Sequence, residues 1–395
     1  MTRGKSAQYL DSLKKRGYFP EVDFELSDEQ AMLRAASRDL LSDRASIDVV
    51  RAQLDQDEDV DPAFWRLAAQ LGWAGLAIPE EHDGAGQGLV ELTLVAEEIG
   101  RALARGPFLP TALVGRALAR GAAPSLRAAV LPALAAGAAW ATWAFAEPRS
   151  PWTLDGIHAT ARTDGAAVVL DGVKTAVQDA DGARWLLVTA RHEGAPASFL
   201  VDRDAPGVAV RRQRVLDLTR SFYEVRLDGV RVPRDHRVHR GPAEVQQGLD
   251  DASVLMSGET LGVLHRLLEL TVEYLKVRVQ FDRPLGSFQA VKHKCATMAM
   301  LVHGTRAATY YAAMAADAEA PDAARAACVA ASYSSAATGD VAGEALQLHG
   351  GVGFTWDHDL HLYLRRAETD GVLHGDAAIH RDRLCDLVRP APAAH

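Results

Sequence analysis

The sequence contains little cysteine, no long apolar run and no surplus of positive charge. Its three cysteines, Cys295, Cys328 and Cys385, are too widely spaced for a disulfide framework or a Cys-x-x-Cys metal site, so we expect a reducing compartment. The longest weakly polar stretch, residues 128–141, is too short to span a bilayer, and the polar N-terminus shows no signal-peptide core. We therefore expect a cytoplasmic protein without membrane insertion.

Charge and composition narrow the class further. The 43 Lys and Arg residues against 52 Asp and Glu residues give a net charge of −9, so we expect no nucleic-acid partner. A local basic pocket for a phosphorylated ligand is still compatible with that charge. With 395 residues, 48% of them hydrophobic and 24% charged, the chain has the composition of a globular protein of two or three domains.

The pattern of apolar residues changes twice along the chain. After a mostly helical first part, short apolar and β-branched runs occur between 140 and 235, with turn signals such as Asp171-Gly172 and Asp228-Gly229 between them. Apolar residues then recur every three or four positions from Leu261 to Val279, and two more helical stretches follow. We expect an α+β fold with an N-terminal α-helical domain (1–138), a middle β-sandwich or barrel domain (139–237) and a C-terminal four-helix bundle (238–395).

Two segments of the C-terminal part carry chemistry. Residues 274–289 read YLKVRVQFDRPLGSFQ, in which we expect a helix to end near Phe281, with Arg278 one helical turn after Tyr274. A guanidinium binds phosphate oxygens well, although the residues alone favour a helix hairpin with a solvated arginine. Residues 347–354 read QLHGGVGF, and their three glycines allow close backbone approach or simply a tight helix–helix turn.

Together these segments resemble the signatures of the acyl-CoA dehydrogenase family. The matching motifs follow the order of the family and cover nearly the whole chain. They are Phe24–Gln30, Leu71-Gly72-Trp73 through Ile78-Pro79-Glu80, Ala144-Phe145-Ala146-Glu147-Pro148, then Tyr274, Arg278, Gln280-Phe281, Gly286 and Gln289, and finally Gln347, Gly350, Gly351, Gly353 and Phe354.

The resemblance implies a flavoprotein that binds FAD at a subunit interface of a dimer or tetramer, either a homo- or a hetero-oligomer. In the implied reaction a base removes the α-proton of an acyl-CoA, and a hydride passes from the β-carbon to the flavin, which supplies the redox chemistry. The implied electron acceptor is an electron-transfer flavoprotein. The implied FAD contacts are Phe145, Ala146, Ala176, Gln178, Arg278, Gln280, Phe281, Phe288, Gln289, Gln347, Gly350, Gly351 and Asp376.

The catalytic base departs from the family pattern. The usual glutamate near the C-terminus is replaced by His374, and the position that carries it in a second subgroup is Ala252. His374 can accept a proton, and Glu259, two helical turns beyond Ala252, returns to nearly the same helix face. These two residues are the candidate bases, and each could equally be a polar residue without a part in proton transfer.

The residues implied to surround the flavin depart as well. Ala146 replaces a threonine, and Ala176 and Gln178 replace a Trp-x-Thr pair, which we expect to change redox potential or specificity more than binding. His358 and His361 have a spacing that metal ligands can have, but the resemblance places them on a bundle helix and we expect no metal.

These departures resemble a bacterial subgroup in which some members act on steroid side chains and some are heteromers with the base on one subunit type. The main prediction is FAD-dependent α,β-dehydrogenation of an acyl-CoA or related acyl thioester. The alternatives are a base-less subunit of a hetero-oligomeric dehydrogenase, a flavoprotein with another reaction (a lyase or a monooxygenase), and a catalytically silent interaction subunit.

Overall fold

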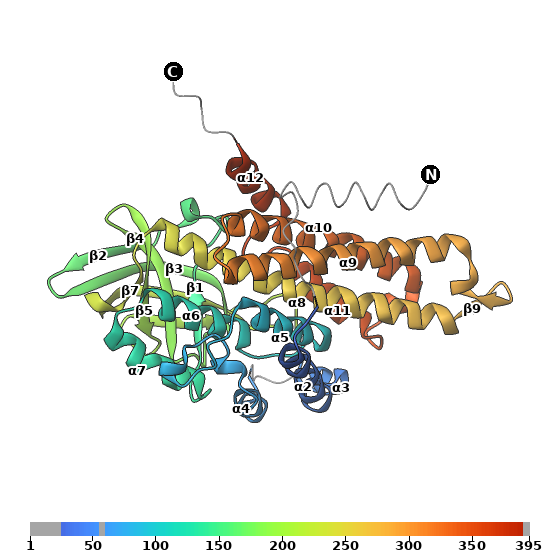
Figure 1. Ribbon diagram of the computed structural model, residues 1–395, viewed down its shortest axis with the longest axis horizontal. Coiled ribbons are helices and arrows are strands. Elements are labelled where there is room, and N and C mark those ends of the chain that lie inside the picture. The colour runs from blue at the N-terminus through green and yellow to red at the C-terminus, as the bar shows by residue number, and fades with distance from the viewer. Residues whose placement is uncertain (1–24, 55–59, 390–395) are drawn as a thin grey trace, which may run out of the picture.

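The computed structural model describes residues 25–54 and 60–389 (Figure 1). Phe24 of the N-terminal motif, and the polar segment before it for which we expect no signal peptide, lie outside the described residues. Within them, no helix is both long enough and apolar enough to cross a membrane. The same described part contains no group of three or more His, Cys, Asp or Glu residues that could hold a metal ion.

The first part of the chain is helical, as its sequence pattern predicts. Its α-helices are α2 (Asp28–Arg44), α3 (Ile47–Gln53), α4 (Pro62–Gln70), α5 (Leu89–Ala102), α6 (Phe108–Gly121) and α7 (Pro124–Ala135). Helix α2 begins at a capping box, in which the Ser27 side chain accepts from the Gln30 amide and the Ser27 amide donates to the Gln30 side chain. Helix α5 packs against both α2 and α8, which explains why it is apolar on most of its surface.

Eight strands follow and form one mixed sheet. They are β1 (Ala141–Ala144), β2 (Thr160–Asp164), β3 (Ala167–Gln178), β4 (Trp185–His192), β5 (Ala195–Asp202), β6 (Val208–Arg212), β7 (Phe222–Pro233) and β8 (Arg237–His239). Their order is β6-β7-β3-β2-β4-β5-β8, and β1 pairs with β4 in parallel. Alternate residues of these strands build a core of their own around Leu170, Val188 and Phe199.

The two Asp-Gly pairs predicted as turns between strands are not turns of that kind. Asp171-Gly172 lies inside β3, where the register with β7 shifts between Leu170 and Gly172, and Asp228-Gly229 lies inside β7. Gly172 has a φ of +148° and Gly229 a φ of +62°, values that glycine adopts without strain. The pairs therefore mark irregularities where two long strands bend, and the turn prediction was wrong.

Long helices return after β8. They are α8 (Pro242–Val277), α9 (Gln289–Asp317), α10 (Ala323–His349), α11 (Leu360–Asp370) and α12 (Ala377–Val388). Helices α8, α9 and α10 pack against one another, and the helical stretches predicted from Leu261, from Val291 and from Ala323 are confirmed. A small hairpin of β9 (Val279–Gln280) and β10 (Arg283–Pro284) joins α8 to α9. The first of the predicted stretches ends at Val277 rather than near Phe281, because Val279 already pairs in β9.

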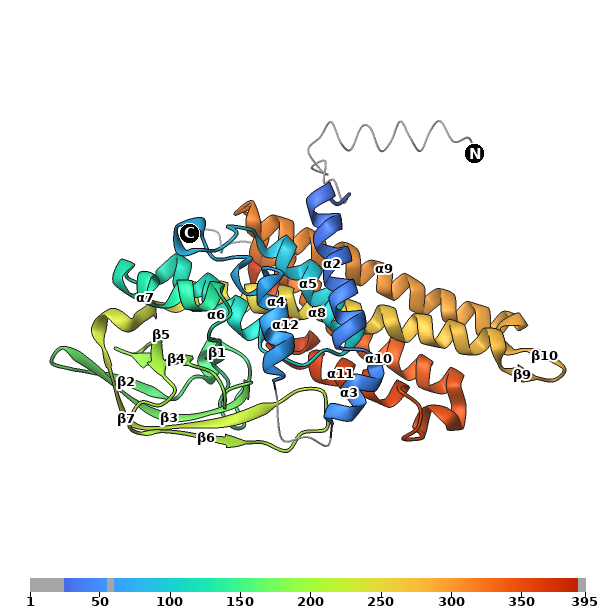
Figure 2. The ribbon, with the colours of Figure 1, turned by 90° about the horizontal axis from the view of Figure 1, so that it is seen from below.

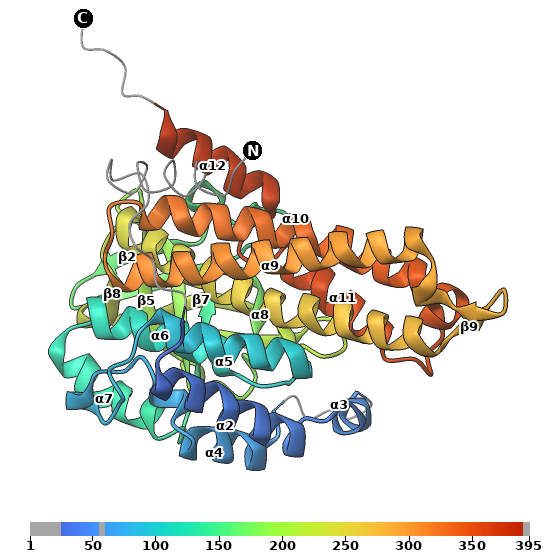
Figure 3. The same ribbon diagram turned by 45° about the vertical axis from the view of Figure 1, so that its right-hand side comes forward.

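The arrangement is that of the expected α+β fold. The sheet lies at one end of the molecule, and the bundle helices extend from it to the β9–β10 hairpin at the other end (Figures 1 and 2). Figure 3 shows α9, α8, α5 and α2 in successive layers, in agreement with the contacts of α5 with both α8 and α2. Helix α8 connects the three parts of the fold, because it contacts the sheet, the N-terminal helices and the other bundle helices. The domain limits given above stay a prediction.

Candidate active site

A buried ion pair fixes the backbone next to the Glu-Pro motif. Lys174 of β3 is fully buried, and its Nζ donates to Glu147 Oε1 at 2.7 Å and to the Phe145 carbonyl at 3.0 Å. The Glu147 carboxylate also accepts the backbone amides of His158 and Ala159. Burial lowers the pKa of Lys174 to about 8, against the opposing attraction of Glu147. This pair holds the segment that contains Phe145 and Ala146, and the sequence reasoning missed it.

The end of β3 is irregular where two of the implied flavin contacts lie. Ala176 has a φ of +50°, the register with β7 shifts between Lys174 and Val177, and the Ala176 amide donates to the Gln213 side chain. Two residues on, the side-chain oxygen of Gln178 accepts from Arg220 at 2.9 Å. Hydrogen bonds to Gln213 and Arg220, which lie on other segments, thus hold these two positions at the irregular end of the strand.

Ala176, Gln178 and His374 meet around one narrow cavity, which we call the reaction slot. The slot has a volume of about 30 Å³ and is also lined by Leu109, Pro110, Leu113, Thr142, Trp143, Trp152, Phe222 and Leu373. The Trp152 ring stacks on Phe145 at 5.8 Å and meets the His374 ring edge-on at 4.9 Å. The structure therefore brings together the Glu-Pro segment, the end of β3 and the position of the family's glutamate.

His374 stands where the slot meets a wider cleft. It has a φ of +62° and lies in the short connection between α11 and α12. Burial, together with the charges of Arg220 and His380, lowers the pKa of His374 to about 3. The imidazole is therefore uncharged at neutral pH. The wider cleft, of about 410 Å³, runs between the Trp152–Asp155 segment, α8 and α12.

Glu259, the second candidate base, belongs to a buried charge cluster. Its carboxylate pairs with Arg366 and, at 2.8 Å, with Arg220. Arg220 also pairs with Asp370 at 2.8 Å, and Arg366 pairs with Asp217 at 3.1 Å. Burial raises the pKa of Asp370 to about 8. Glu259 lines a separate, very small cavity next to Arg220, which places it behind Gln178 rather than beside His374.

The remaining implied FAD contacts lie far from the slot of the same chain. Arg278, Gln280 and Phe281 are exposed on the β9–β10 hairpin, where the Phe281 side chain is 83% exposed. Gln347, Gly350 and Gly351 are exposed at the end of α10. The two groups lie near each other, because Tyr274 of α8 stacks on His349 of α10 at 4.6 Å.

The last three implied contacts occupy local roles. Phe288 precedes α9 and carries the Arg283 guanidinium over its ring at 3.8 Å, and Gln289 begins that helix. Asp376 caps α12, where its side chain accepts the amides of Ala378 and Ile379. Ala252, at the second glutamate position, is buried on α8.

Comparison with known proteins agrees with this arrangement. The family model for the acyl-CoA dehydrogenase N-terminal domain matches residues 27–138, and the model for the C-terminal domain matches residues 239–387. The chain is 34% identical over 353 residues to the acyl-CoA dehydrogenase IpdE2 of Mycolicibacterium smegmatis, which covers 89% of this chain and 96% of that protein.

Two solved structures are also similar over almost their whole length. The ChsE4-ChsE5 complex of Mycobacterium tuberculosis contains a chain with a TM-score of 0.87 and 29% identity, covering 94% of this chain and 100% of that one. A variant of the Tcur3481-Tcur3483 steroid ACAD gives a TM-score of 0.84 and 32% identity, covering 91% and 98%. The chain belongs to the acyl-CoA dehydrogenase family of FAD-dependent oxidoreductases.

Proposed function

We propose that this chain takes part in the FAD-dependent α,β-dehydrogenation of an acyl-CoA, and that a second, related chain of the same assembly supplies the carboxylate base. The observation that carries the proposal is that no carboxylate lines the slot in the described part of the chain, where His374, whose imidazole has a low pKa and no charge at neutral pH, stands at the position of the family's glutamate. A group with so low a pKa is a poor acceptor for the weakly acidic α-proton of a thioester.

In this proposal the residues of this chain bind and orient the cofactor and the acyl group. Bound FAD would supply the hydride acceptor, and the Phe145–Ala146 segment, which Lys174 and Glu147 hold in place, would contact it. Gln178 is oriented by Arg220 and offers its amide nitrogen to the same region. Trp152, Leu109 and Leu113 exclude water from the slot, so that the acyl group lies in apolar surroundings.

The exposed FAD-contact residues favour an interface site. The Arg278 side chain is exposed where α8 ends, and the Phe281 side chain is exposed three residues later in the chain. An exposed guanidinium and an exposed aromatic ring in one short segment suit the phosphate and adenine groups of FAD in a neighbouring chain. The names of the two similar structures, ChsE4-ChsE5 and Tcur3481-Tcur3483, each pair two proteins, which supports a hetero-oligomer here. We further propose an electron-transfer flavoprotein as the electron acceptor and the cytoplasm as the compartment.

A competing assignment keeps the base on this chain. His374 lines the slot directly and contacts Trp152, so its imidazole has the position that proton transfer requires. The two assignments differ in what the chain does alone. With His374 as base, the purified chain reduces its flavin with an acyl-CoA. With a base on the partner, it does so only in the assembly.

The test is the absorption spectrum of the purified chain, alone and co-expressed with a candidate partner chain that carries the family's glutamate. Each preparation then receives butyryl-, octanoyl- or a steroid side-chain CoA thioester without oxygen. Bleaching of the flavin only in the co-expressed sample supports the proposal, and bleaching by the chain alone favours His374. A yellow complex that no acyl-CoA bleaches contradicts dehydrogenation and favours another flavin reaction. A colourless one favours a silent interaction subunit.

A further inference from the structure

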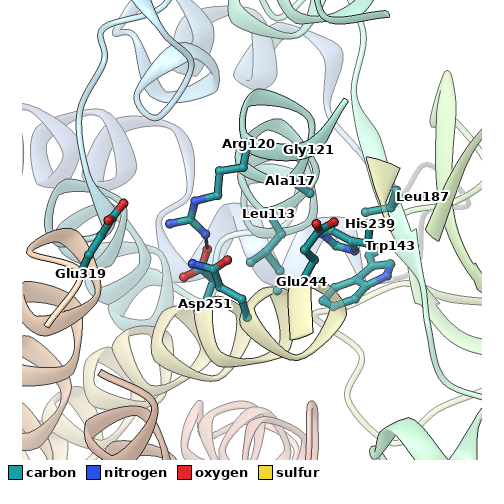
Figure 4. Close-up of a pocket in the computed structure, with 12 residues that line it drawn as sticks. Leu113, Ala117, Arg120, Gly121, Trp143, Leu187, His239, Glu244, Asp251 and Glu319 are labelled. Atoms are coloured by element: carbon teal, nitrogen blue, oxygen red, sulfur yellow. Dashed lines mark hydrogen bonds and ion pairs between the residues drawn. The ribbon is translucent and has the colours of Figure 1, made fainter. Parts of the chain in front are cut away.

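A larger cavity lies behind the reaction slot, and we call it the rear cavity. It has a volume of about 310 Å³ and is enclosed by one face of α6, the first turns of α8 and the β1–β4–β8 side of the sheet (Figure 4). Its lining includes Leu113 and Trp143, which also line the slot. These two side chains are therefore the wall between the slot and the rear cavity.

A buried chain of hydrogen bonds orients the histidine in this cavity. Trp143 Nε1 can only donate, and it donates to Thr189 Oγ1 at 2.9 Å. Thr189 Oγ1 lies 2.8 Å from Ser198 Oγ, which lies 3.0 Å from His239 Nδ1. Among the described residues, the hydrogen-bond partners of the Thr189 hydroxyl are Trp143, which can only donate, and Ser198. The indole N–H and both hydroxyl hydrogens find acceptors when Thr189 donates to Ser198 and Ser198 donates to His239.

This direction fixes the tautomer of His239. Its Nδ1 accepts, so its Nε2 carries the hydrogen. Burial lowers the pKa of His239 to about 4, so the ring is neutral and keeps a single N–H. The ring is 5% exposed, and its Nε2 has no hydrogen-bond partner among the described residues. It faces Gly248, where a Cβ would lie 3.6 Å from Nε2 and 3.1 Å from the Trp143 ring. The absent side chain of Gly248 therefore leaves the N–H open to the cavity.

An acceptor stands beside this donor. Glu244, whose negative charge acts on His239, lies on the same side of the cavity as that ring in Figure 4, with Arg120 and Asp251 on the other side. Its Oε2 accepts the Arg240 amide at 2.6 Å, and further lone pairs of the carboxylate stay available to a ligand. Arg120 and Arg116 both pair with Asp251 Oδ2, at 2.5 and 3.0 Å, and Arg116 also lies 3.8 Å from Asp317, so two carboxylates balance the two guanidinium groups. The cavity thus offers no free positive charge, and Glu244 would repel a carboxylate or a phosphate.

We propose that the rear cavity binds a hydroxyl group on the far part of the acyl substrate, so that the substrate is a hydroxylated acyl-CoA with an apolar body. An alcohol oxygen accepts from His239 Nε2 and donates to Glu244, which uses both protein groups at once. A ketone oxygen could accept from His239 but would face the negatively charged Glu244 carboxylate without a hydrogen to donate to it, and an ammonium group would oppose the N–H of His239. Leu113, Ala117, Trp143 and Leu187 supply the surface for the apolar body. The inference rests on the proposed dehydrogenation, because the slot must hold the thioester end.

The first test needs no turnover. Menthol and its ketone, menthone, are titrated into the FAD-loaded assembly by calorimetry. We expect menthol to bind and menthone to bind about tenfold more weakly. His239→Phe should remove that preference, and Gly248→Ala should weaken menthol binding by narrowing the access to Nε2. His236→Phe is the matched control, because His236 lies on the neighbouring segment and bonds to the Leu200 carbonyl outside the cavity. Equal binding of both probes to wild type and to the His239 variant would overturn the inference.

The second test uses the reaction. Hexanoyl-, octanoyl- and decanoyl-CoA, each with and without a terminal hydroxyl, are compared by anaerobic flavin bleaching. We expect at least one hydroxylated thioester to show about tenfold tighter binding than its parent, and His239→Phe to remove the difference. Flavin bleaching without a preference for the hydroxylated thioester at any acyl length would contradict the hydroxyl site and leave the proposed dehydrogenation intact. Selective menthol binding without bleaching by any acyl-CoA supports the hydroxyl site and sinks the dehydrogenation instead.

Discussion

Replacing His374 by glutamine is the most direct test of where the base resides. Burial lowers the pKa of His374 from the ordinary value of 6.5 to about 3. Protonating this imidazole is therefore harder than protonating an ordinary one by about 5 kcal/mol, or about 3,000-fold in equilibrium. A general base contributes about 100- to 10,000-fold to the rate, so an imidazole this weakly basic gains little from its position. We expect His374→Gln to reduce flavin at a rate within about threefold of wild type in the assembly.

The assay is the anaerobic bleaching of oxidised flavin in a stopped-flow instrument, with the acyl-CoA that bleaches the wild-type assembly. His380→Gln is the matched control, since His380 lines the wider cleft beside His374 but belongs to α12. FAD content and thermal midpoint of each variant show whether the site is intact. A loss of about 100-fold or more in His374→Gln alone, with FAD retained, would refute the reasoning and make His374 the base.

Three further predictions follow from buried charges and from the exposed hairpin. The folded-state pKa of Lys174, about 8, lies below its unfolded value, so the unfolded chain binds more protons and stability should increase with pH from about 8 to about 10.5, by up to about 3 kcal/mol. The difference in thermal midpoint between wild type and Lys174→Met should therefore increase over that range, and a flat difference would contradict the lowering of the Lys174 pKa by burial. Glu259→Ala leaves two buried guanidinium groups short of a partner and should destabilise the chain by about 3–5 kcal/mol. The control Glu269→Ala removes a half-buried carboxylate and should cost less than about 1 kcal/mol. Equal melting temperatures of the two variants in differential scanning fluorimetry would contradict this prediction. Phe281→Ala should lower the FAD content read from the spectrum without changing the melting of the apo chain, whereas unchanged FAD content would place the adenine elsewhere.

The sequence was most informative where one helix face is buried. The apolar spacing from Leu261 to Val279 predicts the second half of α8, whose other face is half-exposed. The first half of α8 showed no such period, because nearly every residue from Asp251 to Leu264 is buried between other elements. The Asp-Gly pairs misled because a glycine with positive φ serves a bend inside a strand as well as a turn.

The site could be predicted only where a local motif marks it. The Glu-Pro segment and the position of His374 are visible as motifs, and the structure places them around one slot. The charge cluster joins Arg220, Glu259 and Asp370, which lie on three elements far apart in the chain. In the sequence each of these residues looks like an ordinary surface charge, because residues that pair from distant parts of the chain leave no local sequence pattern. The tautomer of His239 likewise depends on a series of hydrogen-bonded side chains, Trp143, Thr189 and Ser198, which lie on three different strands.

The position of the β9–β10 hairpin has a consequence for handling the protein. The slot lies next to the sheet, whereas Arg278 and Phe281 project from the opposite end of the molecule. In the proposed arrangement, with FAD between two chains, dissociation of the cofactor and separation of the subunits become one linked equilibrium. Dilution should then release flavin, and added FAD should drive assembly. The colour of a preparation would report its protein concentration as well as its integrity, so spectra should be compared at matched concentration.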